Sequence, residues 1–137
     1  MWRIILSCGW RFAEAIGVSR ERVLDASPSA ASASLVRAFT ELAEGGHVSS
    51  GLAALYAYES QIPAVATAKI DGLRRFYGVT DERGLAFFTV HEKADLWHAR
   101  TGAELIARHC NGDNDRKLAV DAGDSALGAL WSMLDAC

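Results

Sequence analysis

The stretch FFTVHEKADLWHARTG, residues 87–102, decides the predicted fold. At about 100° per residue, steps of four and seven return to within about 40° of the starting direction, so His91, Asp95 and His98 share one face of a helix. Phe87 lies on the same face, which we therefore expect to point toward the core. A buried carboxylate or imidazole is costly unless it is paired or binds a metal. The spacing predicts a ladder of polar groups, about 10 Å long, that share a partner.

Glu59 is a second polar residue on an apolar stripe. It lies seven residues after Leu52 and four after Leu55. Two neighbouring helices would then direct Glu59 and the ladder inward. Nitrogen and oxygen ligands from facing helices, with no thiolate, suit a non-haem iron or manganese site. A single histidine is more often a surface or hydrogen-bonded core residue, so the prediction depends on the spaced set.

The rest of the chain also has helical periodicity. Loop signals occur around Pro28 and at residues 44–47, 77–84 and 111–115, and the segments between them are too long for strands. We therefore predict an all-α bundle. Its apolar stripes are Leu35, Phe39 and Leu42; Leu52, Leu55, Ile62, Ile70 and Leu73; Phe87, Phe88, Leu105 and Ile106; and Leu127, Leu130, Trp131 and Leu134.

Local signals predict how these helices start and bend. Thr80 or Asp81, and Asp113 or Asn114, are N-cap candidates for the last two helices. Pro63 removes a backbone donor and crowds the carbonyl of Glu59. Because the periodic pattern resumes after Pro63, we expect a kink in one long helix rather than a helix end.

Composition bounds the class of protein. The 137 residues suit a single domain, residues 1–137, and the formal net charge of −3 favours neither nucleic acid nor an anionic membrane as a partner. The apolar run near the N-terminus is too short to span a bilayer. Three distant cysteines without metal-ligand spacing indicate free thiols in a reducing compartment, and hence a cytoplasmic protein.

Other candidates are Lys69, about 80° from Glu59 on a continuous helix, and Tyr58, about 100° from it. A kink would let Lys69 border the same cavity as Glu59. His47 and His109 are expected to be solvated.

Two segments carry a family resemblance: GLAALYAYESQIPAVATAKIDGLRRFYG, residues 51–78, and GLAFFTVHEKADLWHA, residues 84–99. They resemble the haem-oxygenase-like TenA/PqqC superfamily, in its iron-containing redox branch with the CADD-like chlamydial proteins that make p-aminobenzoate. The resemblance runs from about Arg11 to the C-terminus. It implies a haem-oxygenase-like helical bundle with a di-iron or iron–manganese centre that uses O2, without haem or flavin.

The resemblance also implies roles for individual residues. Glu59, His91, Asp95 and His98 become metal ligands. Lys69, ten residues after the glutamate, becomes a reacting residue, and Tyr58, beside Glu59, is the second catalytic candidate. The substrate is then a small molecule or the chain's own side chains, since in this branch a tyrosine ring becomes the product and a lysine gives its nitrogen.

The chain also departs from the family pattern. Members are longer and carry a further glutamate and histidine ligand on earlier helices, so we expect an N-terminally truncated form of the fold. Phe87 stands where the family often has a tyrosine.

Several functions remain open. The first is a CADD-like, oxygen-dependent oxidoreductase linked to p-aminobenzoate. The second is a catalytically inactive helical remnant that dimerises to cover an apolar groove. The third is a metal-free TenA/PqqC-like biosynthesis protein with an active-site cysteine, although Cys110 lies away from the ladder. A homodimer is expected.

Overall fold

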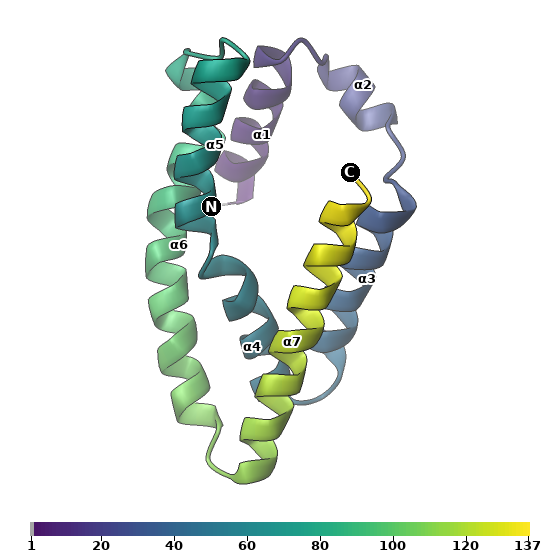
Figure 1. Ribbon diagram of the computed structural model, residues 1–137, viewed down its shortest axis with the longest axis vertical. Helices are drawn as coiled ribbons and strands as arrows, with labels where there is room; N and C mark the ends of the chain where they lie inside the picture. The colour runs from purple at the N-terminus through teal and green to yellow at the C-terminus, as the bar shows by residue number, and fades with distance from the viewer. Residues whose placement is uncertain (1) are drawn as a thin grey trace. The chain divides into compact units, whose positions relative to one another are not determined.

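A computed structural model describes residues 2–137, with side chains from residue 7 onward, and the described chain is helical without any strand (Figure 1). The all-α prediction is confirmed. The helices are α1 (Trp2–Ala15), α2 (Arg20–Asp25), α3 (Ala30–Glu44), α4 (Val48–Glu59), α5 (Ile62–Phe76), α6 (Glu82–His109) and α7 (Asp113–Asp135).

The helices form two compact units. The first comprises Met1–Ser27 and Ile62–Asp95, and the second comprises Pro28–Gln61 and Leu96–Cys137. The division falls inside α6, whose N-terminal half belongs to the first unit and whose C-terminal half belongs to the second. A single domain over the whole chain stays a prediction.

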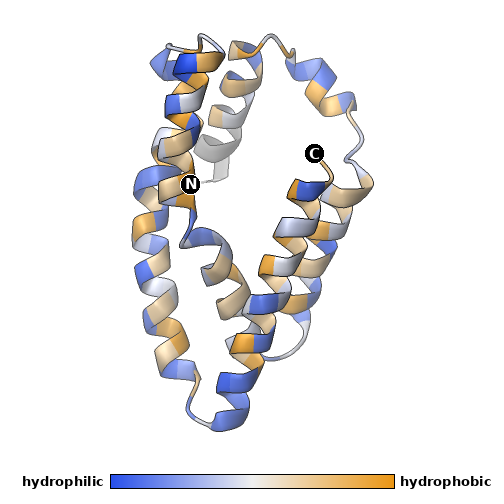
Figure 2. Cartoon of the chain, viewed as in Figure 1, coloured by the Kyte–Doolittle hydropathy of each residue, from blue (hydrophilic) through white to orange (hydrophobic). Residues whose placement is uncertain are grey.

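The second unit is built on small residues. In it α7 packs against both α3 and α4, and α3 contacts α4 (Figure 1). Alanines at helix contacts let backbones approach closely, whereas the larger Trp131 of α7 is 65% exposed. Apolar and polar bands alternate along α7, and the turn before it is hydrophilic (Figure 2). The buried alanines are Ala53 and Ala54 of α4 and Ala119, Ala122 and Ala126 of α7.

The first unit is built on aromatic residues. The Phe88 ring lies edge-on to Phe12 at 4.9 Å and to Phe87 at 5.3 Å between ring centroids. Such T-shaped pairs are the favoured geometry for aromatic quadrupoles. Leu85, only 1% exposed, is the largest fully buried side chain in the described part of the protein.

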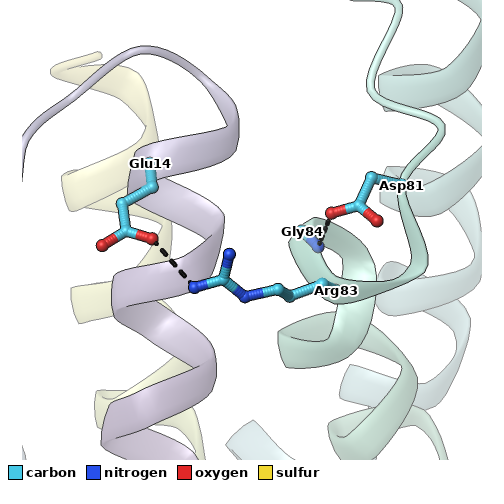
Figure 3. A network of polar contacts seen from close by, with 4 residues as sticks. All are labelled: Glu14, Asp81, Arg83 and Gly84. Carbon is cyan, nitrogen blue, oxygen red and sulfur yellow. Dashed lines mark hydrogen bonds and ion pairs between the residues drawn. The ribbon is translucent and has the colours of Figure 1, made fainter.

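Polar contacts hold α1 and the start of α6 in the first unit. Arg83 of α6 reaches Glu14 of α1 at 3.3 Å, and the Asp81 carboxylate accepts a hydrogen bond of 3.0 Å from the Gly84 amide (Figure 3). The second contact makes Asp81 the N-cap of α6, as its sequence predicts. At α7 the expectation was wrong by one residue, because Gly112 occupies the N-cap position and Asp113 begins the helix.

The expected kink at Pro63 was wrong. The helix ends at Glu59, and α5 starts at Ile62 after a turn at Ser60 and Gln61. The Gln61 side chain donates to the Ala57 carbonyl at 2.6 Å, which satisfies one of the free carbonyls at the end of α4. Pro63 instead occupies the first turn of α5, where its missing N–H costs nothing.

Cys8, Cys110 and Cys137 are all free thiols. Among the described residues, no helix combines the length and the apolar character that crossing a membrane requires.

Candidate metal centre

Glu59 and His98 meet in the second unit. Glu59 is the last residue of α4, and His98 lies in the C-terminal half of α6. The Glu59 Oε1 and His98 Nδ1 atoms are 3.7 Å apart, and the two side chains are only 28% and 25% exposed. A carboxylate and an imidazole therefore face each other in partial shelter from water.

Asp95 lies on the same helix as His98. It precedes His98 by three residues, so the two side chains lie on one face of α6, about one turn apart. Asp95 is 4% exposed, which makes it the most buried of the sequence-predicted ligands. One ligand atom from each of Glu59, Asp95 and His98 lies within 4.8 Å of the other two.

This donor set fits a transition-metal ion. Metal–nitrogen and metal–oxygen bonds of about 2.1 Å place two ligand atoms on one ion at most about 4.2 Å apart. The observed upper separation of 4.8 Å would close with a small side-chain rotation. One imidazole and two carboxylates without a thiolate suit iron or manganese better than a soft metal.

His91 is outside this group. It lies in the N-terminal half of α6, where its Nδ1 atom is 2.7 Å from the Phe87 carbonyl oxygen and its ring packs at a tilt of 41° against Phe87, with 4.3 Å between the ring centroids. Because a carbonyl can only accept, Nδ1 carries the proton and Nε2 keeps its lone pair in the neutral ring. The structure orients His91 as metal-binding histidines are oriented, but its role as a ligand stays a prediction.

The two predicted catalytic residues lie elsewhere. Tyr58, in the second unit, is 43% exposed, and its ring packs edge-on against Phe39 of α3 at 6.1 Å. Lys69, in the first unit, is exposed, and its ammonium lies 5.8 Å from the Phe88 ring centroid. Both roles stay predictions.

A cavity lies beside Glu59 and His98, and its lining includes residues that the sequence analysis did not single out. Its volume is about 170 Å³, and it lies between α4 and the C-terminal half of α6. Tyr56 lines it, because three helical residues return to within about 60° of Glu59, whereas Tyr58 points about 100° away. The spacing of three residues between Tyr56 and Glu59 could therefore have predicted that Tyr56 lies near the site. The lining residues are Leu52, Leu55, Tyr56, Glu59, Trp97, His98, Thr101, Gly102 and Leu105.

The helical architecture and a histidine–carboxylate group are typical of one class of protein, the helical, non-haem metal proteins whose ligands lie on facing helices. A family model described as "iron-containing redox enzyme" matches residues 10–131. The chain belongs to this iron-containing redox enzyme family, as its haem-oxygenase-like resemblance predicts.

Curated relatives narrow the comparison. The chain is 39% identical over 127 residues to a 4-aminobenzoate synthase of Chlamydia muridarum, covering 92% of this chain and 53% of the relative. It is 35% identical over 127 residues to a 4-aminobenzoate synthase of Nitrosomonas europaea, covering 92% of this chain and 52% of the relative. The chain spans about half the length of the curated relatives it matches.

Proposed function

We propose that the chain works as an oxygen-dependent, iron-containing oxidoreductase that forms 4-aminobenzoate. The observation that carries this proposal is the grouping of Glu59, Asp95 and His98 at the end of α4 and on α6. Membership of the iron-containing redox enzyme family and the names of the relatives support it. The cytoplasm is the proposed location, since the three cysteines are free.

The proposed centre holds iron in a di-iron or iron–manganese pair. Glu59, Asp95 and His98 would bind the first ion. His91 would be a further ligand of the centre, through its Nε2 atom. When bound, the metal supplies the binding and reduction of O2. Half-burial of Glu59 and His98 restricts access of water to their ligand atoms, which strengthens their hold on a cation.

Lys69 and Tyr58 are the proposed reacting residues. Lys69 offers an exposed primary amine, which is the group that an aromatic amine product requires. The substrate is a small molecule or a side chain of the protein itself.

A catalytically inactive, dimerising protein is the second candidate. A hollow of about 650 Å³ in the second unit is lined mainly by apolar residues of α4, α6 and α7, and one of them, Trp131, is 65% exposed. Apolar surface of this kind favours association with another protein. Sedimentation of the protein and of Trp131→Ser tests this: we expect a dimer that the substitution weakens. A parent protein that is monomeric would contradict it.

Iron binding tests the proposed oxidoreductase. We expect protein purified without oxygen to bind Fe(II), measured by elemental analysis after removal of free metal. We expect each of three substitutions to weaken this binding at least about tenfold: Glu59→Gln, Asp95→Asn and His98→Gln. Replacing a residue that only hydrogen-bonds to a metal ligand already costs about tenfold in metal affinity, and replacing the ligand itself should cost more. Formation of 4-aminobenzoate in the presence of Fe(II), O2 and a reductant is then followed by chromatography.

Glu104→Gln is the matched control. Glu104 lies on α6, as Asp95 and His98 do. Its side chain is 52% exposed and pairs with Arg100. Its replacement removes one charge without touching the candidate centre. Equal iron content in Glu59→Gln and Glu104→Gln proteins would contradict the proposed site.

A further inference from the structure

The hollow of about 650 Å³ in the second unit is separate from the candidate metal centre. Its volume falls within the range of about 300–1,000 Å³ that is usual for small-molecule sites. The residues described as lining it include none of Glu59, Asp95 and His98. The hollow therefore offers a second place where a ligand of moderate size can bind.

One face of α7 forms much of the wall of the hollow, and Asp124 interrupts that face. Its residues follow one another at steps of four, three and four, which places them on one side of the helix: Val120, Asp124, Leu127 and Trp131. Among the described residues Asp124 has no ion-pair partner, whereas Asp121, on another face of α7, pairs with Lys117. A carboxylate among apolar wall residues thus has no cation of the described chain beside it.

The electrostatic potential in the hollow is negative for two further reasons. Ala57 and Ser60 line it at the C-terminal end of α4, where the helix dipole places roughly half a negative charge. No Lys, Arg or His is among the described lining residues. The second unit as a whole has nine Asp and Glu against five Lys and Arg, a formal net charge of −4. These charges attract a cation and repel an anion.

The walls of the hollow favour an organic cation over a metal ion. Hard metal ions need several oxygen ligands at once, and Asp124 is the one carboxylate among the described lining residues. Most of the wall is apolar, which suits an aliphatic chain. Tyr56 and Trp131 add aromatic rings, which attract weakly hydrated cations such as quaternary ammonium groups.

We propose that the hollow binds an alkylammonium ion, with its cationic nitrogen toward Asp124 and its aliphatic chain along the apolar wall of α7. This site goes beyond the proposed oxidoreductase, because it uses neither iron nor any of the candidate metal ligands. Its ligand class is a monovalent organic cation with an apolar chain.

The test is a titration of the metal-free, ¹⁵N-labelled full chain with hexyltrimethylammonium, which carries a permanent positive charge. We expect saturable chemical-shift changes centred on the Gly123 amide and the Trp131 indole N–H. Hexan-1-ol has the same chain without the charge and should bind about fivefold more weakly. Hexanoate should bind more weakly still. Added salt should weaken the binding of hexyltrimethylammonium and leave that of hexan-1-ol unchanged.

Asp124→Asn removes the charge with little change of shape. Asp124 is exposed, so the substitution should not disturb the fold. It should weaken binding of hexyltrimethylammonium about threefold and leave hexan-1-ol binding unchanged. Asp121→Asn is the matched control, because it removes the same charge from α7 at a side chain that is 56% exposed and outside the described lining. It should leave both affinities unchanged.

The outcomes separate this inference from the proposed function. Absence of saturable shifts at the hollow overturns the site, whether or not iron binds, and a dimer detected by sedimentation would then assign the hollow to a second copy. Equal affinity for hexyltrimethylammonium and hexan-1-ol overturns the preference for a cation. Equal affinity in Asp124→Asn and the parent overturns the role of Asp124. Binding in the expected order supports the site even if iron binding fails.

Discussion

The two halves of α6 differ in how much space lies beside a glycine. A Cβ atom added at Gly84, in the N-terminal half, would lie 2.6 Å from Cβ of Ala15 in α1, closer than real side chains approach. An added Cβ at Gly102, in the C-terminal half, would make only ordinary contact with Tyr56. One helix thus serves as a close-packed wall in the first unit and as one side of a cavity in the second.

The two halves of α6 also differ in what their histidines, His91 and His98, contact. His91 contacts its own helix through the Phe87 carbonyl and through tilted packing against the Phe87 ring. His98 faces Glu59 of another helix and lines the cavity. Tight packing stabilises the N-terminal half, whereas the C-terminal half leaves room for a ligand beside its polar groups.

The largest expected effect is that of Leu85→Ala. Leu85 is 1% exposed, and removing its side chain leaves a void in the first unit, so we expect the free energy of unfolding to fall by about 3 kcal/mol. Leu96→Ala is the control, because Leu96 lies in the other half of α6 and is 63% exposed. Urea denaturation measures both. Equal losses would remove the contrast between the halves.

Gly84→Ala and Gly102→Ala form a matched pair with a smaller effect. Both replace a glycine inside a helix, which alone should stabilise the protein by roughly 1 kcal/mol. At Gly84 the clash with Ala15 should outweigh this gain and lower stability by about 1–2 kcal/mol overall. At Gly102 the gain should remain. Thermal unfolding that shifts both variants in the same direction would show that Gly84 is not held closely.

Asp81→Ala should have the smallest effect on stability. It removes the hydrogen bond from the Gly84 amide to the Asp81 carboxylate, which should cost about 1 kcal/mol. Thr80→Ala is the control, since Thr80 is the exposed neighbour that the sequence offers as an alternative cap. Hydrogen exchange in the first turn of α6 should rise only in Asp81→Ala. A rise in Thr80→Ala alone would reassign the cap.

Helical spacing predicted more of the fold than of the site. Periodicity predicted that Glu59, Asp95 and His98 each lie on an inward-facing side of a helix, because it states which residues of one helix share a face. The end of α4 could not be predicted, since a kinked helix and two consecutive helices have the same periodic pattern around Pro63. The cavity depends on how far apart two helix surfaces lie, and spacing along one chain contains no such distance.

The end of α4 at Glu59 has an electrostatic consequence. The backbone dipoles of a helix sum to roughly half a negative charge at its C-terminus. Because Pro63 cannot donate to the Glu59 carbonyl, that negative pole lies at the residue whose carboxylate faces His98. Pro63 thereby favours a negative end of the main-chain dipole at the place where a cation is needed, before any ion arrives.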